Sequence, residues 1–178
     1  SEEKKVYDDF KKYLNEYKIS EAKGFIFPSR LIKSSTIIQM KDCTVYGNLE
    51  LKNPDIGLIE FCTIYGIFSI SNKTLKNDLT FHENLCLQRV NMCGLSFNGN
   101  CSIENSYIKT LKLSQSRIYN GMQIKNCSLS DISFERVHLS SRLCISCLNR
   151  KSLLDYVPYF EPYNTYFNSE KDDLVDTI

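Results

Sequence analysis

The chain has 178 residues, of which 42% are hydrophobic and 24% are charged, and its formal net charge is +1. These values are typical of one globular domain and exclude a disordered or strongly charged chain. No apolar run reaches the length of about 18 residues that a membrane helix needs, and the first residues are charged throughout. The sequence therefore predicts neither a membrane span nor a signal peptide, and we expect a cytoplasmic protein.

Residues 1–35 are assigned to an N-terminal helix and cap. Residues 2–17 predict an amphipathic helix, and Gly24 and Pro28 then turn the chain into the repeat that follows. We favour a helix that covers the first coil, because a solenoid needs a cap over its exposed strand edges. The alternative is a docking helix for a partner. The apolar face of the helix is formed by Val6, Phe10, Tyr13, Leu14 and Tyr17.

Residues 36–148 contain a repeat in which an apolar residue returns every five or six positions. A small or apolar partner lies two residues before each return, and side chains at i and i−2 of an extended chain point to one face. Each unit is therefore a short strand followed by a corner, and helical spacing is absent. Equivalent positions lie 21 residues apart, which predicts a four-sided coil of about 21 residues and five turns. The clearest returns are Ile103, Ile108, Leu113, Ile118, Ile124, Leu129, Phe134, Leu139 and Ile145.

The segment NPDIG at residues 53–57 interrupts this spacing, and we expect it to form a loop that bulges from one corner. Beyond the repeat, residues 149–178 carry apolar and aromatic residues, two prolines and an excess of acidic residues. We interpret them as a short C-terminal cap over the last coil followed by an aromatic and acidic tail.

Units such as NCSIE, NSYIK, QSRIY, NCSLS and DISFE resemble the pentapeptide-repeat family, from about residue 42 to residue 148. The resemblance implies an all-β fold, a right-handed, four-sided parallel β-helix, and a C-terminal cap that can serve as a homodimer contact. The units depart from the family pattern, because the position before the centre varies and six-residue units interrupt the fives. A right-handed helix of the pectate-lyase or bactofilin kind is the alternative. The left-handed hexapeptide helix fits less well, since its turn has about 18 residues.

The eight cysteines are interpreted as reduced thiols. Four of them occupy the small inward position of the repeat, where a thiol behaves as a small hydrophobe: Cys43, Cys62, Cys101 and Cys127. Cys144 and Cys147 form the only C-x-x-C motif. A metal site is not favoured there, because neither a second pair nor a nearby histidine accompanies it.

The sequence supports no catalytic constellation and no cofactor site, although it leaves an enzymatic role open. His82 and His138 are both expected at outward positions, and pairing of Cys86 with His82 would need an electropositive pocket. No glycine-rich phosphate loop is present. The acidic residues of the repeat are dispersed among Lys and Arg, which does not support the paired carboxylates of glycoside hydrolysis.

Nucleic-acid binding is not favoured either. Residues 43–147 contain ten Lys or Arg against eight Asp or Glu, whereas a DNA-binding stripe would be more basic. A DNA mimic would be more acidic.

Outward tyrosines are the remaining candidate for recognition. Tyr46 and Tyr65 follow inward residues in the matching segments CTVYGN and CTIYGI, and Tyr119 follows Ile118 in the same way. Exposed tyrosines provide contact area with little loss of entropy on binding. We predict that a protein-binding surface uses these three residues and Tyr159 and Tyr163 of the tail; ordinary surface decoration is the alternative.

The leading functional hypothesis is a non-enzymatic scaffold that binds an unidentified protein, as in the targeting β-helix of a bacterial effector secreted into a host cell. That analogy is drawn from architecture and composition. A topoisomerase-binding protector, of the kind known among pentapeptide-repeat proteins, is the second hypothesis. A β-helix enzyme is the third, and it would require converging acids or a Cys-His pair.

Overall fold

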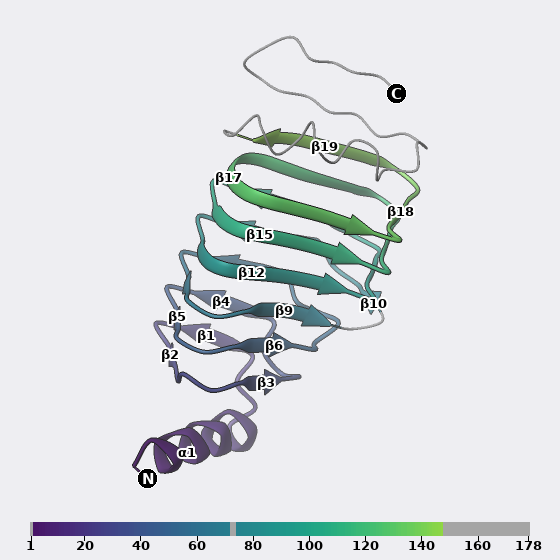
Figure 1. Cartoon of the computed structure of the whole chain (residues 1–178). Helices are drawn as coiled ribbons and strands as arrows, with labels where there is room; N and C mark the ends of the chain where they lie inside the picture. The colour runs from purple at the N-terminus through teal and green to yellow at the C-terminus, as the bar shows by residue number, and fades with distance from the viewer. Residues whose placement is uncertain (1, 72–73, 148–178) are drawn as a thin grey trace.

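The alternation of inward and outward side chains winds the chain into a parallel β-solenoid, which confirms the predicted fold class. The computed structural model describes residues 2–71 and 74–147. Within these residues the chain completes about six turns of about 21 residues each, with one helix at the N-terminal end (Figure 1). The predicted C-terminal cap, residues 149–178, lies outside the described residues.

Strand pairing divides the solenoid into four faces, each a ladder of parallel strands in register. Face 1 contains β1 (Glu21–Lys23), β4 (Gln39–Lys41), β7 (Leu58–Glu60), β11 (Leu79–His82), β14 (Asn100–Glu104), the start of β17 (Gly121–Glu135) and β19 (Arg142–Cys147). Face 2 contains β2 (Ile26–Phe27), β5 (Thr44–Val45), β8 (Thr63–Ile64), the start of β12 (Leu85–Cys93), the start of β15 (Tyr107–Ser114) and the middle of β17.

The ends of the long strands β12, β15 and β17 continue around a corner onto face 3. Face 3 also contains β3 (Ile32–Ser34), β6 (Leu49–Leu51) and β9 (Phe68–Ser71). Face 4 contains β10 (Thr74–Leu75), β13 (Ser96–Phe97), β16 (Arg117–Ile118) and β18 (His138–Leu139).

The solenoid begins earlier than the predicted boundary at residue 36. Strand β1 already pairs with β4, with Glu21 opposite Gln39, so the first coil has 18 residues and the second has 19. Later coils have 21 or 22 residues. In the first two coils a single buried residue, Ile37 or Ile56, occupies the place of face 4. These short coils hide the regular spacing, which is why the sequence predicted five turns and a later start.

The segment around Pro54 does not bulge from the coil, contrary to expectation. Ile56 is fully buried, and the Asn53 side chain holds the turn by accepting a hydrogen bond from the Asp55 amide at 2.9 Å. The Asn53 Nδ2 group donates to the Thr36 carbonyl of the preceding coil. The proline carbonyl accepts the Lys76 amide of the next coil. The segment thus closes the second coil. Proline is tolerated there because it has no backbone N–H, and this corner position needs no amide donor.

Corners between faces 1 and 2 share a backbone conformation that polypeptides rarely adopt. One residue of each coil there has a left-handed φ, which only glycine and, less readily, asparagine and aspartate adopt at low cost. Backbone amides of this column donate to carbonyls of the following coil. The column consists of Gly24, Asp42, Phe61, Glu83, Asn105 and Asn126.

From Asp42 onward, the small inward residue that follows each of these corners has a second role that the sequence analysis missed. The Sγ atoms of Cys62 and Cys127 and the Oγ atom of Ser106 each donate to the carbonyl two residues earlier. Asn84 in the same column donates to the Ile59 carbonyl and accepts the Cys62 amide. The Sγ and Oγ atoms therefore add a second hydrogen bond to corner carbonyls that already accept an amide of the preceding coil, and Asn84 gives the buried Cys62 amide its acceptor.

Helix α1 (Glu2–Glu16) covers the first coil, as predicted for a cap. Leu14 is buried, and the Phe10 ring packs edge-on against Phe27 at 5.3 Å between centroids. The Tyr7 hydroxyl donates to the Leu31 carbonyl at 2.9 Å. The predicted apolar face is only partly used, because Val6 and two tyrosines of the helix remain exposed.

Replacing Ile124 by Asp is expected to unfold the domain cooperatively. Its side chain is fully buried between β14 and β19, where an unpaired carboxylate costs more than about 4 kcal/mol. Circular dichroism during thermal unfolding measures the loss. Ser130→Asp, at an exposed position, is the control, and an unchanged melt of Ile124→Asp would contradict the observed packing.

Ser106→Ala tests the corner column. It removes a hydroxyl that donates a hydrogen bond to the Glu104 carbonyl and accepts one from the buried Asn84 amide. We therefore expect the free energy of unfolding to fall by about 2–3 kcal/mol. Ser128→Ala, on the outward side of face 2, should change it by less than about 0.5 kcal/mol. Urea unfolding compares the two, and equal stabilities would argue against a backbone role for the hydroxyl.

Candidate functional site

Face 2 presents an uncharged outer surface over four successive coils, from β2 to β12, and at Tyr107 of the fifth coil, where Lys109 takes the second outward position. Its outward positions from Ile26 to Tyr107 hold only apolar, aromatic and threonine side chains and one proline. The apolar side chains at these positions are exposed to solvent: Ile26 is 65% exposed and Tyr46 is 54% exposed. We call the exposed apolar residues on and beside face 2 the apolar strip: Ile26, Tyr46, Phe61, Tyr65, Leu85, Leu87 and Tyr107.

Two of the predicted tyrosines form the centre of the strip. Tyr46 and Tyr65 lie one coil apart in the same column, and their rings stack with centroids 5.3 Å apart and an interplanar angle of 13°. Such ring pairs contribute about 0.5–1.5 kcal/mol beyond the burial of area, and each ring restricts its neighbour. The structure therefore converts two tyrosines that are separate in sequence into one rigid double ring.

The glycine after each of these tyrosines explains why the segments CTVYGN and CTIYGI match. A Cβ atom on Gly66 would lie 2.0 Å from the Gly47 carbonyl oxygen, and one on Gly47 would lie 2.4 Å from the Ser29 carbonyl carbon. The coils thus touch at this corner with no space for a side chain. In each segment the cysteine and the aliphatic residue point inward and the tyrosine points outward.

Phe61 is a member of the strip that the sequence analysis did not identify. It occupies the left-handed corner column with φ of 53°, although a bulky residue is disfavoured there, and its ring is 43% exposed. The ring contacts His82 edge-on at 6.2 Å, and the Lys41 Nζ atom lies 5.4 Å from its centroid. A strained and exposed aromatic residue is poorly explained by folding alone.

The two long edges of the strip differ in the charges they carry. Asp42 and Glu83 lie in the corner column on the side of face 1, and both are exposed. The Lys41 ammonium on the same side is paired with Glu60 at 2.7 Å. Arg30, Arg89 and Lys109 lie on the side of face 3 or at its border, and they are exposed as well. An uncharged centre with a charged rim is the usual anatomy of a protein-binding surface.

A shallow hollow of about 500 Å³ opens beside Thr63, next to the stacked tyrosines. Thr63 is shorter than the residues around it and therefore leaves a depression between Phe61 and Leu85. The carboxylate of Glu83 and the side chain of Asn105 form the polar edge of this hollow. The hollow can accept one apolar or aromatic side chain with a polar tip.

Tyr119 does not join the strip. It is exposed but lies next to Ile118 on face 4, beside Arg117 and His138. Tyr159 and Tyr163 lie outside the described residues. Of the three predicted site residues that the structure describes, it thus brings together Tyr46 and Tyr65 and places Tyr119 elsewhere.

The conceivable pair of Cys86 and His82 is not formed. Cys86 points into the core from face 2, and burial raises the pKa of its thiol to about 12. His82 points outward from face 1, with its Nε2 atom 3.1 Å from a Glu83 carboxylate oxygen. The thiols of Cys43 and Cys62 form a hydrogen bond between adjacent coils, which lowers the pKa of Cys43 and raises the pKa of Cys62. Both thiols are buried, so a substrate cannot reach them.

The carboxylates of the described coils are held by neighbouring side chains. Glu60 pairs with Lys41 at 2.7 Å, and Glu50 lies within 3.4 Å of both Lys33 and Lys52. The Ser71 hydroxyl, which donates to Glu50 at 2.6 Å, is the main cause that lowers the pKa of this carboxyl, with smaller contributions from the two lysines. Glu104 accepts hydrogen bonds from Ser102 and Gln123.

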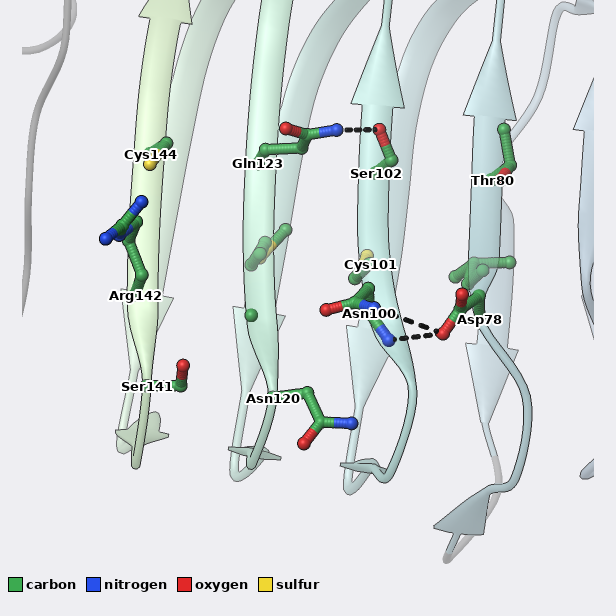
Figure 2. A pocket seen from close by; sticks show the side chains of 13 residues that line it. Asp78, Thr80, Asn100, Cys101, Ser102, Asn120, Gln123, Ser141, Arg142 and Cys144 are labelled. Carbon is green, nitrogen blue, oxygen red and sulfur yellow. Dashed lines mark hydrogen bonds between the residues drawn. The ribbon is translucent and has the colours of Figure 1, made fainter.

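A polar groove of about 570 Å³ crosses the outer side of face 1 (Figure 2). Asp78 is the one carboxylate among its lining residues, and its Oδ1 atom accepts the Asn100 amide at 2.7 Å. Gln123 donates to the Ser102 hydroxyl across the groove at 3.0 Å. The side chains thus satisfy one another along the ladder, and the residues that line this groove include no pair of carboxylates for hydrolysis.

Two further observations concern the described part of the chain. No three His, Cys, Asp or Glu side chains gather there in an arrangement that could hold a metal ion. No helix of residues 2–71 or 74–147 is long and apolar enough to cross a membrane.

Comparisons with protein-family models, with curated proteins and with solved structures found no match to this chain. What the structure establishes is therefore the fold, a parallel β-solenoid.

Phe61→Asn is expected to be more stable than Phe61→Ala by about 0.5–1 kcal/mol. Both changes remove the ring, but asparagine adopts the left-handed backbone conformation more readily than alanine. Urea unfolding measures the difference. A pair of variants with equal stability would show that the backbone at residue 61 is not strained.

Proposed function

We propose that the protein is a non-enzymatic scaffold that binds a protein partner through the apolar strip. The supporting observation is the uncharged, aromatic surface of face 2, which contrasts with the ion pairs on the other faces. Depletion of charge and enrichment of tyrosine distinguish the centre of protein interfaces from the rest of a surface. Hydrogen bonding between successive coils fixes the backbone beneath the strip, which reduces the entropy lost on binding.

The finer parts of the proposal concern family and setting. We infer that the repeat is a degenerate form of the pentapeptide type, because its coils have four faces and inward pairs at i and i−2. A role as a bacterial effector in a host cell stays a proposal based on architecture and composition. A topoisomerase protector that mimics DNA would need an acidic surface, and face 2 offers none. Such a protector would inhibit supercoiling by gyrase at micromolar protein.

The double substitution Tyr46→Glu and Tyr65→Glu is expected to abolish partner binding, because it places two carboxylates at the centre of the strip. Removal of an aromatic hot spot costs about 2 kcal/mol or more, which is at least about a thirtyfold loss of affinity. Tagged wild-type protein and variants would be compared for the proteins they retain from bacterial and animal-cell lysates.

Tyr119→Glu is the matched control, since it adds a carboxylate at an exposed tyrosine on face 4. A partner should be retained by the wild type and by this control and lost by the double variant. Circular dichroism confirms that both variants are folded. If the same proteins were retained by all three, the apolar strip would not be the binding surface.

A further inference from the structure

We propose that the occupant of the apolar strip is a single amphipathic helix of the partner, and that the oppositely charged rims fix the direction in which it lies. This inference rests on the proposed function. It follows from three properties of the strip: its narrow shape, the absence of open backbone groups beneath it, and the sign of the charges along its edges.

The shape of the strip suits one helix and is too small for a stable dimer of this chain. From the coil of Ile26 to the coil of Tyr107 there are four coil steps of about 4.8 Å, which is about 19 Å. Two outward positions per coil give a width of about 7 Å between columns. The product, an area of about 130 Å², is well below the roughly 800 Å² that each partner buries in a standard interface. A helix of about 13 residues has the matching length.

The backbone under the strip offers no hydrogen bonds to a partner. Each strand of face 2 from β5 to β15 is paired on both sides, so an added strand has no edge to join. An extended peptide on this surface would place its own amide and carbonyl groups against apolar rings without partners, at considerable cost. A helix satisfies those groups internally and presents only side chains.

The rims then determine the polarity of the helix. Asp42 and Glu83 line one edge of the strip, and Arg30, Arg89 and Lys109 line the other. A helix with a basic flank and an acidic flank matches both rims in one direction and opposes both when it is reversed. The hollow beside Thr63 lies on the acidic side, so it favours an apolar anchor whose neighbour is Lys or Arg.

The test uses four designed peptides of about 16 residues, each with leucines at helical spacing and both termini blocked. The first carries Lys on one flank and Glu on the other, the second carries Lys on both, and the third carries Glu on both. The fourth is the first peptide with a central proline, which breaks the helix. Fluorescence anisotropy measures their affinity for the full chain.

We expect the first peptide to bind with a dissociation constant of about 10–100 µM, as for small transient interfaces, and at least about fivefold tighter than the second or third. The proline peptide should not bind. Asp42→Lys with Glu83→Lys makes both rims basic and should transfer the preference to the peptide with Glu on both flanks. A nitroxide at the N-terminus of the first peptide should broaden NMR signals at one end of the strip only.

Several outcomes would overturn the inference. Equal binding of all four peptides would contradict both the helical conformation of the occupant and the role of the charged rims. Broadening of NMR signals at both ends of the strip would contradict a fixed direction of the helix. Self-association of the wild type that Tyr65→Glu abolishes would identify a second copy as the occupant. If no peptide binds although the double tyrosine variant still loses its captured partner, the helix is wrong and the proposed function stands. If the capture also shows no difference, both fail.

Discussion

The in-register stacking of successive coils is the constraint on which the rest of this structure depends. Each residue lies over its equivalent at a spacing of about 4.8 Å and is hydrogen-bonded to it, so the environment of a position is shared by the whole column. Inward columns must therefore be apolar, and corner columns must tolerate a left-handed backbone. Outward columns have no such requirement, and their composition is free to serve solubility or recognition.

The corners show how closely the sequence must follow this constraint. A left-handed residue in one coil brings a backbone turn that each neighbouring coil must reproduce, and the inward residue after it must fit beneath the sharp corner. Serine, cysteine and asparagine occupy this column from Cys43 to Cys127, because each is short and can form hydrogen bonds with nearby backbone groups. Phe61 is an exception in its corner column, because a bulky side chain disfavours the left-handed backbone and an exposed ring lowers solubility. A local conflict of this kind is expected at a functional position.

The regular part of the fold could be predicted from sequence because the inward pairs and the 21-residue period are visible from Cys101 to Ile145. The first coil could not, since Gly24 and Pro28 look like chain breaks when they are in fact corners, and Pro54 looks like part of a bulging loop when its segment closes the second coil. Only Tyr46 and Tyr65 of the strip could be found, through the repeated segments CTVYGN and CTIYGI. Leu85, Leu87 and Tyr107 occur in units without that motif, so only the register of β12 and β15 shows that they continue the same surface.

The contrast between faces argues that the apolar strip is more than surface variation. On face 1 the outward column from Lys41 through Glu60 and His82 to Glu104 and Lys125 mixes charges of both signs, which keeps a paired ladder soluble. Face 2 has the same backbone and the same pairing but lacks charge over four coils, from β2 to β12. Because the stacking constraint acts equally on both faces, it cannot explain the difference. The exposed rings of Tyr46, Tyr65 and Phe61 lower solubility, and Phe61 also strains its corner, so their presence is best explained by contact with another molecule.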